Sequence, residues 1–462
     1  MNPKDPFDLT RRSFMKQACC AAVGATGMLS TLAQLRLIGA MAADAAPSGY
    51  KALVCLFLQG GNDTNNVIIP SDTADYNAYA AARSFLAIPQ SQLLPISPTT
   101  YSDGRSYGLH PAVPEIQSLF SQGKLAFLAN TGTLVQPTNL AEYNAGTALP
   151  PQLFSHIDQQ TQWQSSVPDQ PFTTGWGGRL ADLVNSMNSN NQISMSIGLT
   201  GNNSFQVGNS VAQYAVSPSG AIILSGSTST PTSQNGVRYK AQTDLLSVRE
   251  ASLFQTAFGG LTSNSIAESQ VLNGALSNAA TLKTVFPATT TGGQLNMIAR
   301  LISAGPSLGL TRQVFFAQLG GWDLHASQVT AHGPLLTEIS QALNAFYAAT
   351  VELGVANQVT TFTASDFSRT YNPNGTGTDH GWGTHCLIMG GAVNGKNIYG
   401  QMPSLVVGGP DDTGRGRWIP STSVDEYAAT LATWFGVSST NMSTVLPNIG
   451  RFATSNLGFM GS

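Results

Sequence analysis

Acidic and imidazole side chains gather at two places in the second half of the chain. The segment Asp379-His380-Gly-Trp-Gly-Thr-His385 holds two of the six histidines, and the pair Asp323-Leu-His325 follows an apolar run. Carboxylates and imidazoles are common ligands of divalent metal ions. If the chain carries out chemistry, we expect it at these residues.

The spacing of these residues selects candidate metal ligands. Asp323 and His325 stand two apart, so in a strand-like geometry both side chains reach one ion; the alternative is a solvated turn. Asp366 directly follows another apolar run and is interpreted as a ligand, with a helix cap as the alternative. Of His380 and His385, which are five apart in a glycine-rich loop, one is expected to bind metal and the other to support it. His380 is the preferred ligand, and His385 is kept as the second candidate.

Apolar runs that alternate with helix-spaced segments predict the elements that position these residues. Continuous apolar runs ended by polar or glycine residues are typical of strands buried on both faces of a parallel sheet. The sequence therefore predicts an α/β fold with a mainly parallel sheet flanked by helices. The expected strands are 52–58, 125–129, 314–317 and 359–364, and the expected helices are 114–120 and 334–353, with 241–304 mostly helical.

Polar residues follow each of the four expected strands. They are Asp63, Asn130-Thr131, Asp323 and Asp366. A single aspartate after a glycine turn is more often a turn former or a helix cap. Ligands in open α/β sheets, however, bind beyond the carboxyl ends of the strands, so four such residues predict a shared crevice. Asp63 is therefore a candidate ligand as well.

Ser155 is the candidate nucleophile. It lies next to His156 at the expected start of a helix, where a metal ion could activate its hydroxyl group. The alternative is an N-cap serine beside a surface histidine. Adjacent serine and histidine side chains point apart in a strand, so Ser155-His156 is not by itself a serine-hydrolase dyad.

The N-terminus fits the twin-arginine export pattern, with Thr-Arg-Arg-Ser-Phe-Met-Lys starting at Thr10. Residues 1–46 are interpreted as a signal peptide recognised by the twin-arginine export machinery. A retained membrane anchor is the alternative, but Gln34 and Arg36 interrupt the apolar stretch. We expect the mature chain, residues 47–462, to have no stable membrane span and to be periplasmic or extracellular.

Composition limits the remaining possibilities. Charged residues make up 10% of the chain and the net charge is -3, so no basic field favours nucleic acid as a partner. Residues 47–462 are expected to form one domain, in which the Asn-, Ser- and Gly-rich stretch 184–240 is an inserted β or loop region. Cys55 and Cys386 lie in apolar runs, so core thiols are favoured over a disulfide.

Several motifs occur in an order that resembles an exported bacterial family, the domain of unknown function 1501, over about residues 50–437. That family is similar to the alkaline-phosphatase and sulfatase superfamily, which carries a two-metal site at the strand ends of an α/β sheet. The resemblance implies one metal near Asp63, Ser155 and Asp366, and another near Asp323, His325 and His380. The motifs are Gln59-Gly-Gly-Asn-Asp63, Gly108-Leu-His-Pro111, Ser155-His156, Gly320-Gly-Trp-Asp-Leu-His325, Ser365-Asp-Phe-Ser-Arg-Thr370 and Asp379-His380.

The resemblance implies an exported, metal-dependent hydrolase of phosphate or sulfate esters. A divalent ion (Zn, Mn, Mg or Ca) would polarise a small anionic ester, and Ser155 or a hydroxide on the ion would attack. Arg369 would help to neutralise the oxyanion.

Two departures from the superfamily pattern leave alternatives open. Phe367 follows Asp366 where the superfamily usually has a histidine, and Asp323 and His325 are two apart where four is usual. A descendant with one metal or none is one alternative. A non-catalytic exported binding or cell-surface assembly protein on the same fold is another.

Overall fold

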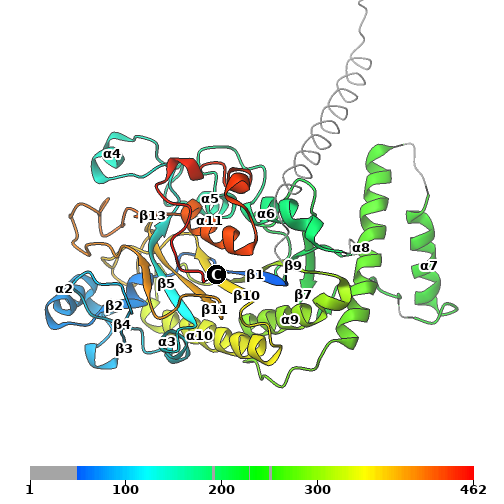
Figure 1. Ribbon diagram of the computed structural model, residues 1–462, viewed down its shortest axis with the longest axis horizontal. Coiled ribbons are helices and arrows are strands. Elements are labelled where there is room, and N and C mark those ends of the chain that lie inside the picture. Colours follow the sequence, from blue (N-terminus) through cyan, green and yellow to red (C-terminus); the bar gives the residue numbers. More distant parts are fainter. Residues whose placement is uncertain (1–48, 190–192, 228, 249–251, 462) are drawn as a thin grey trace, which may run out of the picture. The chain divides into compact units, whose positions relative to one another are not determined.

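A ten-stranded sheet with helices on both faces organises the chain (Figure 1). The computed structural model describes residues 49–189, 193–227, 229–248 and 252–461. All of them belong to one compact unit. The expected signal peptide, residues 1–46, lies outside the described residues.

Most neighbouring strands of the central sheet run parallel, and the predicted α/β class with a mainly parallel sheet is confirmed. The exceptions are β11, which is antiparallel to both of its neighbours, and β8, which is antiparallel to β7. The spatial order is β12 (Ile398–Gly400), β5 (Leu125–Gly132), β11 (Thr384–Gly390), β10 (Val359–Ser365), β1 (Lys51–Leu58), β9 (Arg312–Leu319), β6 (Ser196–Gly198), β7 (Tyr214–Ser217) and β8 (Gly220–Ala221), and β13 (Thr422–Ser423) also pairs with β5.

The central strands form the core because both of their faces are covered. Every residue of β10 and β11 is buried, as are all residues of β1 after Lys51. This explains why their sequences are continuous apolar runs and do not alternate with polar residues. Cys55 in β1 and Cys386 in β11 are free and buried, and burial raises the pKa of both thiols. The prediction of core thiols is confirmed.

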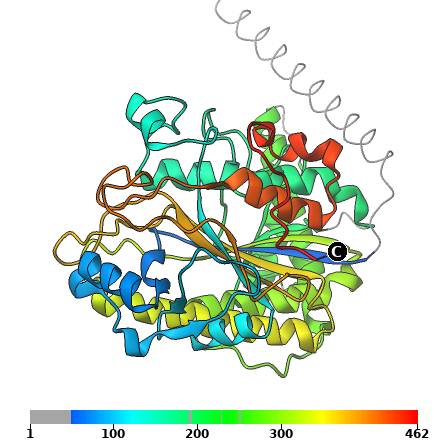
Figure 2. The same cartoon turned by 60° about the vertical axis from the view of Figure 1, so that its left-hand side comes forward.

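Helices cover the two faces of the sheet in separate layers (Figure 2). The predicted helix 334–353 corresponds to α10, which begins six residues earlier, ends one residue earlier and contains Pro334. One layer holds α3 (Pro114–Ser121), α9 (Thr290–Ala304) and α10 (Gln328–Glu352); the other holds α5 (His156–Ser165), α6 (Trp176–Val184), α11 (Val424–Phe435) and α12 (Met442–Val445).

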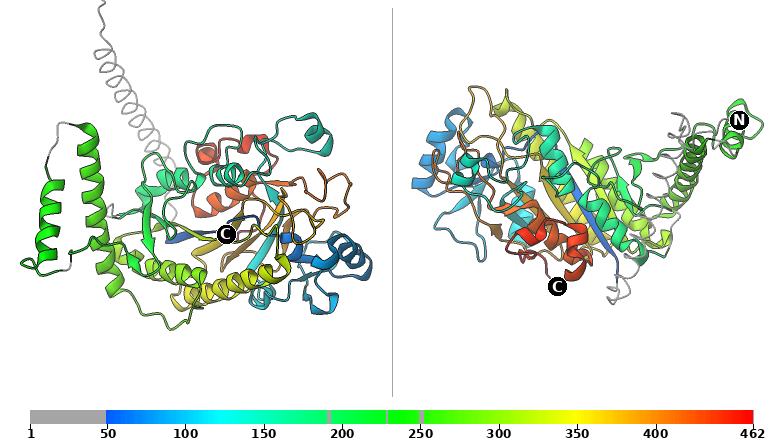
Figure 3. Two further views of the ribbon diagram at one scale, coloured as in Figure 1. Left: turned by 180° about the vertical axis from the view of Figure 1, so that it is seen from behind. Right: turned by 90° about the horizontal axis from the view of Figure 1, so that it is seen from above.

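The stretch 184–240, predicted as an insertion, contributes in part to the central sheet. Ile197 of β6 pairs with Phe315 of β9, and β7 pairs with β6. The short apolar segments of this polar stretch are therefore strands that bury one edge of β9. Beyond β8, α7 (Gln234–Leu246) and α8 (Leu253–Asn278) form a helical hairpin (Figure 3).

Smaller elements complete the described chain. None of the described helices combines the length and the apolar character needed to cross a bilayer. The second sheet has the order β2 (Ile68–Pro70), β4 (Tyr107–Leu109) and β3 (Leu94–Ile96). The remaining helices are α2 (Thr73–Arg83) and α4 (Leu140–Ala145), with 3-10 turns η1 (Thr64–Asn66), η2 (Ser84–Leu86), η3 (Gln90–Gln92), η4 (Asn185–Met187), η5 (Gly305–Leu308), η6 (Ser439–Asn441) and η7 (Ile449–Arg451).

Candidate metal centre

Strands β10, β1 and β9 end side by side at one edge of the sheet. Leu58 of β1 pairs with Ser365 of β10 and with Leu319 of β9. Asp366 follows β10 immediately, and Asp323 lies in the loop after β9. Two carboxylates from distant parts of the sequence therefore meet where α/β sheets commonly bind ligands.

Gly60, which follows β1, connects these two carboxylates. Its N–H donates to Asp366 Oδ1 (3.2 Å), and its carbonyl oxygen accepts from Arg369 Nη1 (3.2 Å). Arg369 Nη1 also donates to Asp323 Oδ1 (2.8 Å). Gly60 has a φ of +115°, and a Cβ there would lie 2.5 Å from the backbone nitrogen of Asp323. Only glycine fits at this position.

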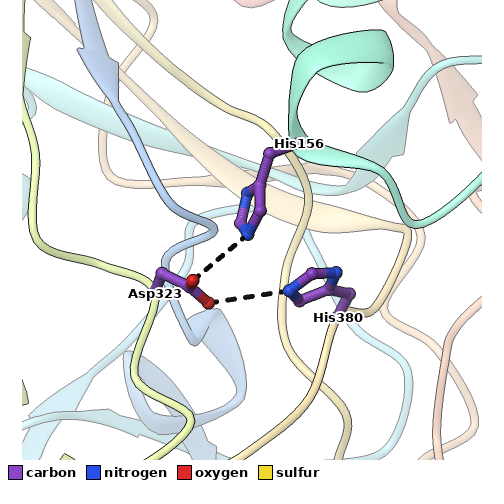
Figure 4. Close-up of side chains that lie close together, drawn as sticks. All are labelled: His156, Asp323 and His380. Atoms are coloured by element: carbon purple, nitrogen blue, oxygen red, sulfur yellow. Dashed lines mark ion pairs between the residues drawn. The ribbon is translucent and has the colours of Figure 1, made fainter.

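Three imidazole rings converge on the carboxylate of Asp323, and Figure 4 shows two of them. His156 Nε2 lies 3.5 Å from Asp323 Oδ2, and His380 Nε2 lies 3.6 Å from Asp323 Oδ1. His325 Nε2 lies 3.0 Å from the same Oδ1 and 2.8 Å from His380 Nε2. We call these four residues the His/Asp cluster.

An acceptor oxygen holds each imidazole of the His/Asp cluster at Nδ1. Because these acceptors favour a proton on Nδ1, the neutral ring keeps its lone pair on Nε2, which faces the cluster. Metal-binding histidines in proteins are oriented in this way. The three contacts are His156 Nδ1 with Asp366 Oδ2 (2.6 Å), His325 Nδ1 with Asp379 Oδ1 (3.2 Å), and His380 Nδ1 with the carbonyl oxygen of Phe154 (2.6 Å).

The residues of the His/Asp cluster fit a divalent transition-metal ion. His156 Nε2 is buried and has no hydrogen-bond partner, although a buried polar atom without a partner costs free energy. Imidazoles with a carboxylate are a common donor set for zinc and similar ions. The side chains of Asp323 and His325 are 45% and 44% exposed, so a ligand can reach the cluster from solvent.

The surroundings of the cluster shift the ionisation of its members. The hydrogen bond to Asp366 raises the pKa of His156, whereas burial lowers the pKa of His380. Partial burial alone would raise the pKa of Asp323, but the hydrogen bond and charge of Arg369 hold it below its usual value. Asp323 is therefore an anionic ligand group at neutral pH.

Arg369, predicted to neutralise an oxyanion, is a buried support for Asp323. Its side chain is 0% exposed. Besides Asp323 and the Gly60 carbonyl, it donates to the hydroxyl and the carbonyl oxygen of Thr378. All three guanidinium nitrogens are thus engaged by the protein, so the observed contacts of Arg369 position Asp323, and its predicted role toward an oxyanion stays a prediction.

Asp63, predicted as a metal ligand, forms a buried ion pair with Arg83 of α2 and accepts from Gln328. Burial would raise the pKa of Asp63, but the charge of Arg83 lowers it. Asp63, Ser155 and Asp366 thus have separate partners, and the one set of three His, Cys, Asp or Glu side chains found close enough to share an ion among the described residues is His156, Asp323 and His380. Asp366 instead accepts from Nδ1 of His156, on the side of the ring opposite the Nε2 that faces the cluster.

Ser155 and His385 also lie outside the His/Asp cluster. Ser155 is the N-cap residue of α5, and its Oγ donates to Asp158 Oδ2 (2.5 Å). His385 is buried at the start of β11, where its Nδ1 accepts from the backbone N–H of Asn130 (3.0 Å). The alternative of an N-cap serine therefore describes Ser155, and His380 is the histidine of its loop that joins the cluster.

The sequence matches the family model described as "Protein of unknown function (DUF1501)" over residues 50–414. The chain belongs to this family. The predicted family resemblance is confirmed. No curated protein matches this DUF1501 chain in sequence.

Solved structures similar to this DUF1501 chain share little sequence with it. A sulfatase from Pseudoalteromonas sp. (PsFucS1) is 10% identical, with 94% of this chain and 74% of that chain covered and a TM-score of 0.35. The phosphonate monoester hydrolase from Silicibacter pomeroyi is 6% identical, with 84% and 73% covered and a TM-score of 0.33. Ps i-CgsB in complex with k-i-k-neocarrahexaose is 9% identical, with 86% and 74% covered and a TM-score of 0.35.

Three histidines of the DUF1501 chain are buried outside the His/Asp cluster. Burial lowers the pKa of His110 and of His385 to about 4, and that of His332 to about 3. His332 Nε2 lies 3.0 Å from Asn62 Oδ1 and donates to it. These rings are neutral in the folded chain at physiological pH.

We expect the three buried histidines to make the metal-free protein less stable as the pH falls from 7 to 5. In the unfolded chain they take up protons below about pH 6.5, whereas in the folded chain they stay neutral down to about pH 4. Each histidine should therefore remove up to about 2 kcal/mol of unfolding free energy over this interval. Urea unfolding with a chelator present, at both pH values, measures the loss.

The matched control for this prediction is His332→Gln, which keeps a donor for Asn62 but does not titrate. Its loss of unfolding free energy between pH 7 and pH 5 should be smaller than that of the wild type by the contribution of one histidine, up to about 2 kcal/mol. An unchanged pH dependence in His332→Gln would contradict the assignment. His156 acts in the opposite sense, because its raised pKa favours the folded state at lower pH.

The sequence did not identify His156, which lies at the centre of the DUF1501 cluster. The sequence indicates it only as the neighbour of Ser155, with a surface histidine as one alternative. The available signal was its position at the first turn of a polar helix, two residues after Phe154, whose carbonyl oxygen holds His380. Only the packing of α5 against β10 shows that His156 reaches the strand ends.

Proposed function

We propose that the His/Asp cluster binds a divalent transition-metal ion and that the protein is an exported, metal-dependent hydrolase of phosphate or sulfate esters. One observation carries the proposal: three imidazoles, each held at Nδ1 by an oxygen, turn Nε2 toward the same carboxylate. The imidazole-rich donor set favours zinc or a similar ion over Mg or Ca, which prefer oxygen ligands.

The chain supplies binding and orientation at this site. A bound divalent ion would supply Lewis acidity toward an ester oxygen. The hydrogen bond and charge of Arg369 keep Asp323 ionised. Gly60 links the two carboxylates, because its N–H donates to Asp366 and its carbonyl oxygen accepts from Arg369, which in turn donates to Asp323. The exposure of Asp323 and His325 leaves one side of the cluster open to a small anionic ester.

Export is a separate part of the proposal. The twin-arginine pattern in residues 1–46 supports recognition by the twin-arginine machinery and a periplasmic or extracellular location. That route accepts folded proteins, which suits a chain that takes up its metal before export. Replacement of both arginines of the motif by lysine should retain the chain in the cytoplasm, as fractionation would detect.

Direct measurement of metal and activity tests the hydrolase. Elemental analysis of the purified full chain should find about one transition-metal equivalent, removable with a chelator. Hydrolysis of 4-nitrophenyl phosphate or 4-nitrophenyl sulfate should be lost with the metal and return on its addition. A chain that neither holds a divalent ion nor cleaves either ester after metal addition would contradict the proposal.

A second candidate is an exported binding or assembly protein on the same fold. The supporting observation is the first half of α8, which carries four large apolar side chains, all more than 60% exposed, and no charged residue: Leu253, Phe254, Phe258 and Leu261. Exposed apolar patches of this kind commonly mark interaction sites. Stoichiometric metal with no hydrolysis of either ester would favour this candidate.

A further inference from the structure

Four arginines lie near the strand ends or on the loops beside the His/Asp cluster, and three of them pair with carboxylates. Arg369 pairs with Asp323, Arg415 with Asp379, and Arg83 with Asp63 beneath the strand ends. For Arg417, by contrast, no carboxylate of the described residues lies within ion-pair distance. Within the described chain, this one guanidinium therefore makes no direct ion pair.

Arg417 is nevertheless held in place beside the cluster. Its Nε donates to the carbonyl oxygen of His380 (2.8 Å), and its guanidinium carbon lies 4.8 Å from the ring centroid of Phe154. The carbonyl oxygen of Phe154 in turn accepts from His380 Nδ1. One edge and one face of the guanidinium are therefore fixed by the residues that also orient a cluster histidine. No hydrogen bond joins Nη1 or Nη2 of Arg417 to any of the described residues.

The loop that carries Arg417 is fixed from within by a single carboxylate. Asp412 Oδ1 accepts from the backbone N–H groups of Gly414 (2.7 Å), Gly416 (2.8 Å) and Arg417 (3.0 Å), and its Oδ2 accepts from that of Gly408 (2.8 Å). The neighbouring Trp418 is buried. The guanidinium is thus presented on a constrained loop, which lowers the entropic cost of binding a ligand.

We propose that Arg417 is the anion-binding residue of this site and that the site prefers a doubly charged oxyanion, as in a phosphate monoester, over a singly charged sulfate ester. This rests on the proposed metal site. Taken together, Asp323, Asp366 and Asp379 carry as many negative charges as Arg369, Arg415 and Arg417 carry positive ones, although Arg417 has no direct carboxylate partner.

A divalent ion on neutral imidazoles then adds two positive charges that no side chain of this set offsets. A phosphate monoester carries close to two negative charges above its second pKa of about 6, and a sulfate ester carries one. The two unoccupied Nη groups can hold two oxygens of such a group side by side.

Binding of two non-hydrolysable probes tests this inference without any need for turnover. Methylphosphonate and methanesulfonate have similar shapes, but at about pH 8.5 the first carries nearly two charges and the second one. Isothermal titration of the metal-loaded full chain should show tighter binding of methylphosphonate. Arg417→Gln should weaken that binding by about ten- to a hundredfold, with metal content unchanged, and Arg417→Lys should lie between the two.

The matched control is Arg238→Gln, the same change of charge at an exposed position of α7, which should bind both probes as the wild type does. Equal affinity of Arg417→Gln and the wild type for methylphosphonate would overturn the inference. A parallel loss of metal affinity in Arg417→Gln would also overturn it, because Arg417 would then act through His380. Absence of metal from the wild type is a different result and would overturn the proposed function itself.

Discussion

His156→Ala is expected to lose metal binding and, with it, ester hydrolysis. His156 offers a buried Nε2 without a partner, and its ring is fixed through Nδ1 by Asp366. A four-ligand zinc site is worth about 10–16 kcal/mol, so removal of one ligand should cost about 3 kcal/mol, or roughly a hundredfold in metal Kd. Competition with a chromogenic chelator measures that Kd.

The adjacent residue provides the control for this experiment. Ser155→Ala removes a hydroxyl that donates to Asp158 and contacts no member of the cluster. It should keep the metal affinity of the wild type and lose no more than a few-fold in kcat, because the N-cap makes no side-chain capping hydrogen bond. If Ser155→Ala abolished hydrolysis while metal was retained, Ser155 would be the nucleophile after all. Equal metal affinity in His156→Ala and the wild type would refute the assigned ligand.

Asp366→Asn should raise the metal Kd by about ten- to a hundredfold, the usual range when the acceptor behind a ligating histidine is removed. Asp366 is fully buried and accepts from His156 Nδ1, from Gln160 Nε2 (2.8 Å) and from the N–H of Gly60 (3.2 Å). An asparagine has one acceptor oxygen for these three donors, and its NH2 group faces one of them. Hydrolysis at limiting metal should fall in proportion and recover in excess metal.

Asp379→Asn is the comparison for this second prediction. Asp379 holds His325 at a longer distance (3.2 Å), and its side chain is 26% exposed, so water can replace part of its contact. The metal Kd should therefore rise less than in Asp366→Asn. The reverse order of the two variants would show that His325, and not His156, is the better-held ligand.

The central strands could be predicted from the sequence, because strands buried on both faces have apolar residues at consecutive positions. Leu53 to Leu58 and Val314 to Ala317 are continuous apolar runs, and both are core strands. The strands of the polar stretch 184–240 were harder to predict because they are short: β6 has three residues and β7 four. Short edge strands are specified by their neighbours more than by their own composition.

The candidate site could be predicted only in part, because an aspartate at a strand end does not reveal in the sequence which side chain it contacts in the fold. Asp323 and Asp63 follow similar glycine-containing turns, yet one meets imidazoles and the other Arg83. That difference depends on α2, which brings Arg83 beside Asp63 from 20 positions along the chain. The pairing of Asp323 with His325 and His380, and the role of Phe154, likewise arise from tertiary contacts.

Metal binding at the His/Asp cluster, as proposed above, would also link metal occupancy to completion of folding. His380 is held by Phe154, 226 positions away in sequence, and the other members come from α5 and from the loop after β9. A partly folded chain cannot present all of these groups together, so an ion at this site binds the native state selectively. By mass action, each tenfold excess of free metal over its Kd then adds about 1.4 kcal/mol to the stability of the native chain. The concentration of free metal in the compartment where the chain folds would therefore determine what fraction of the chain is in the native state there.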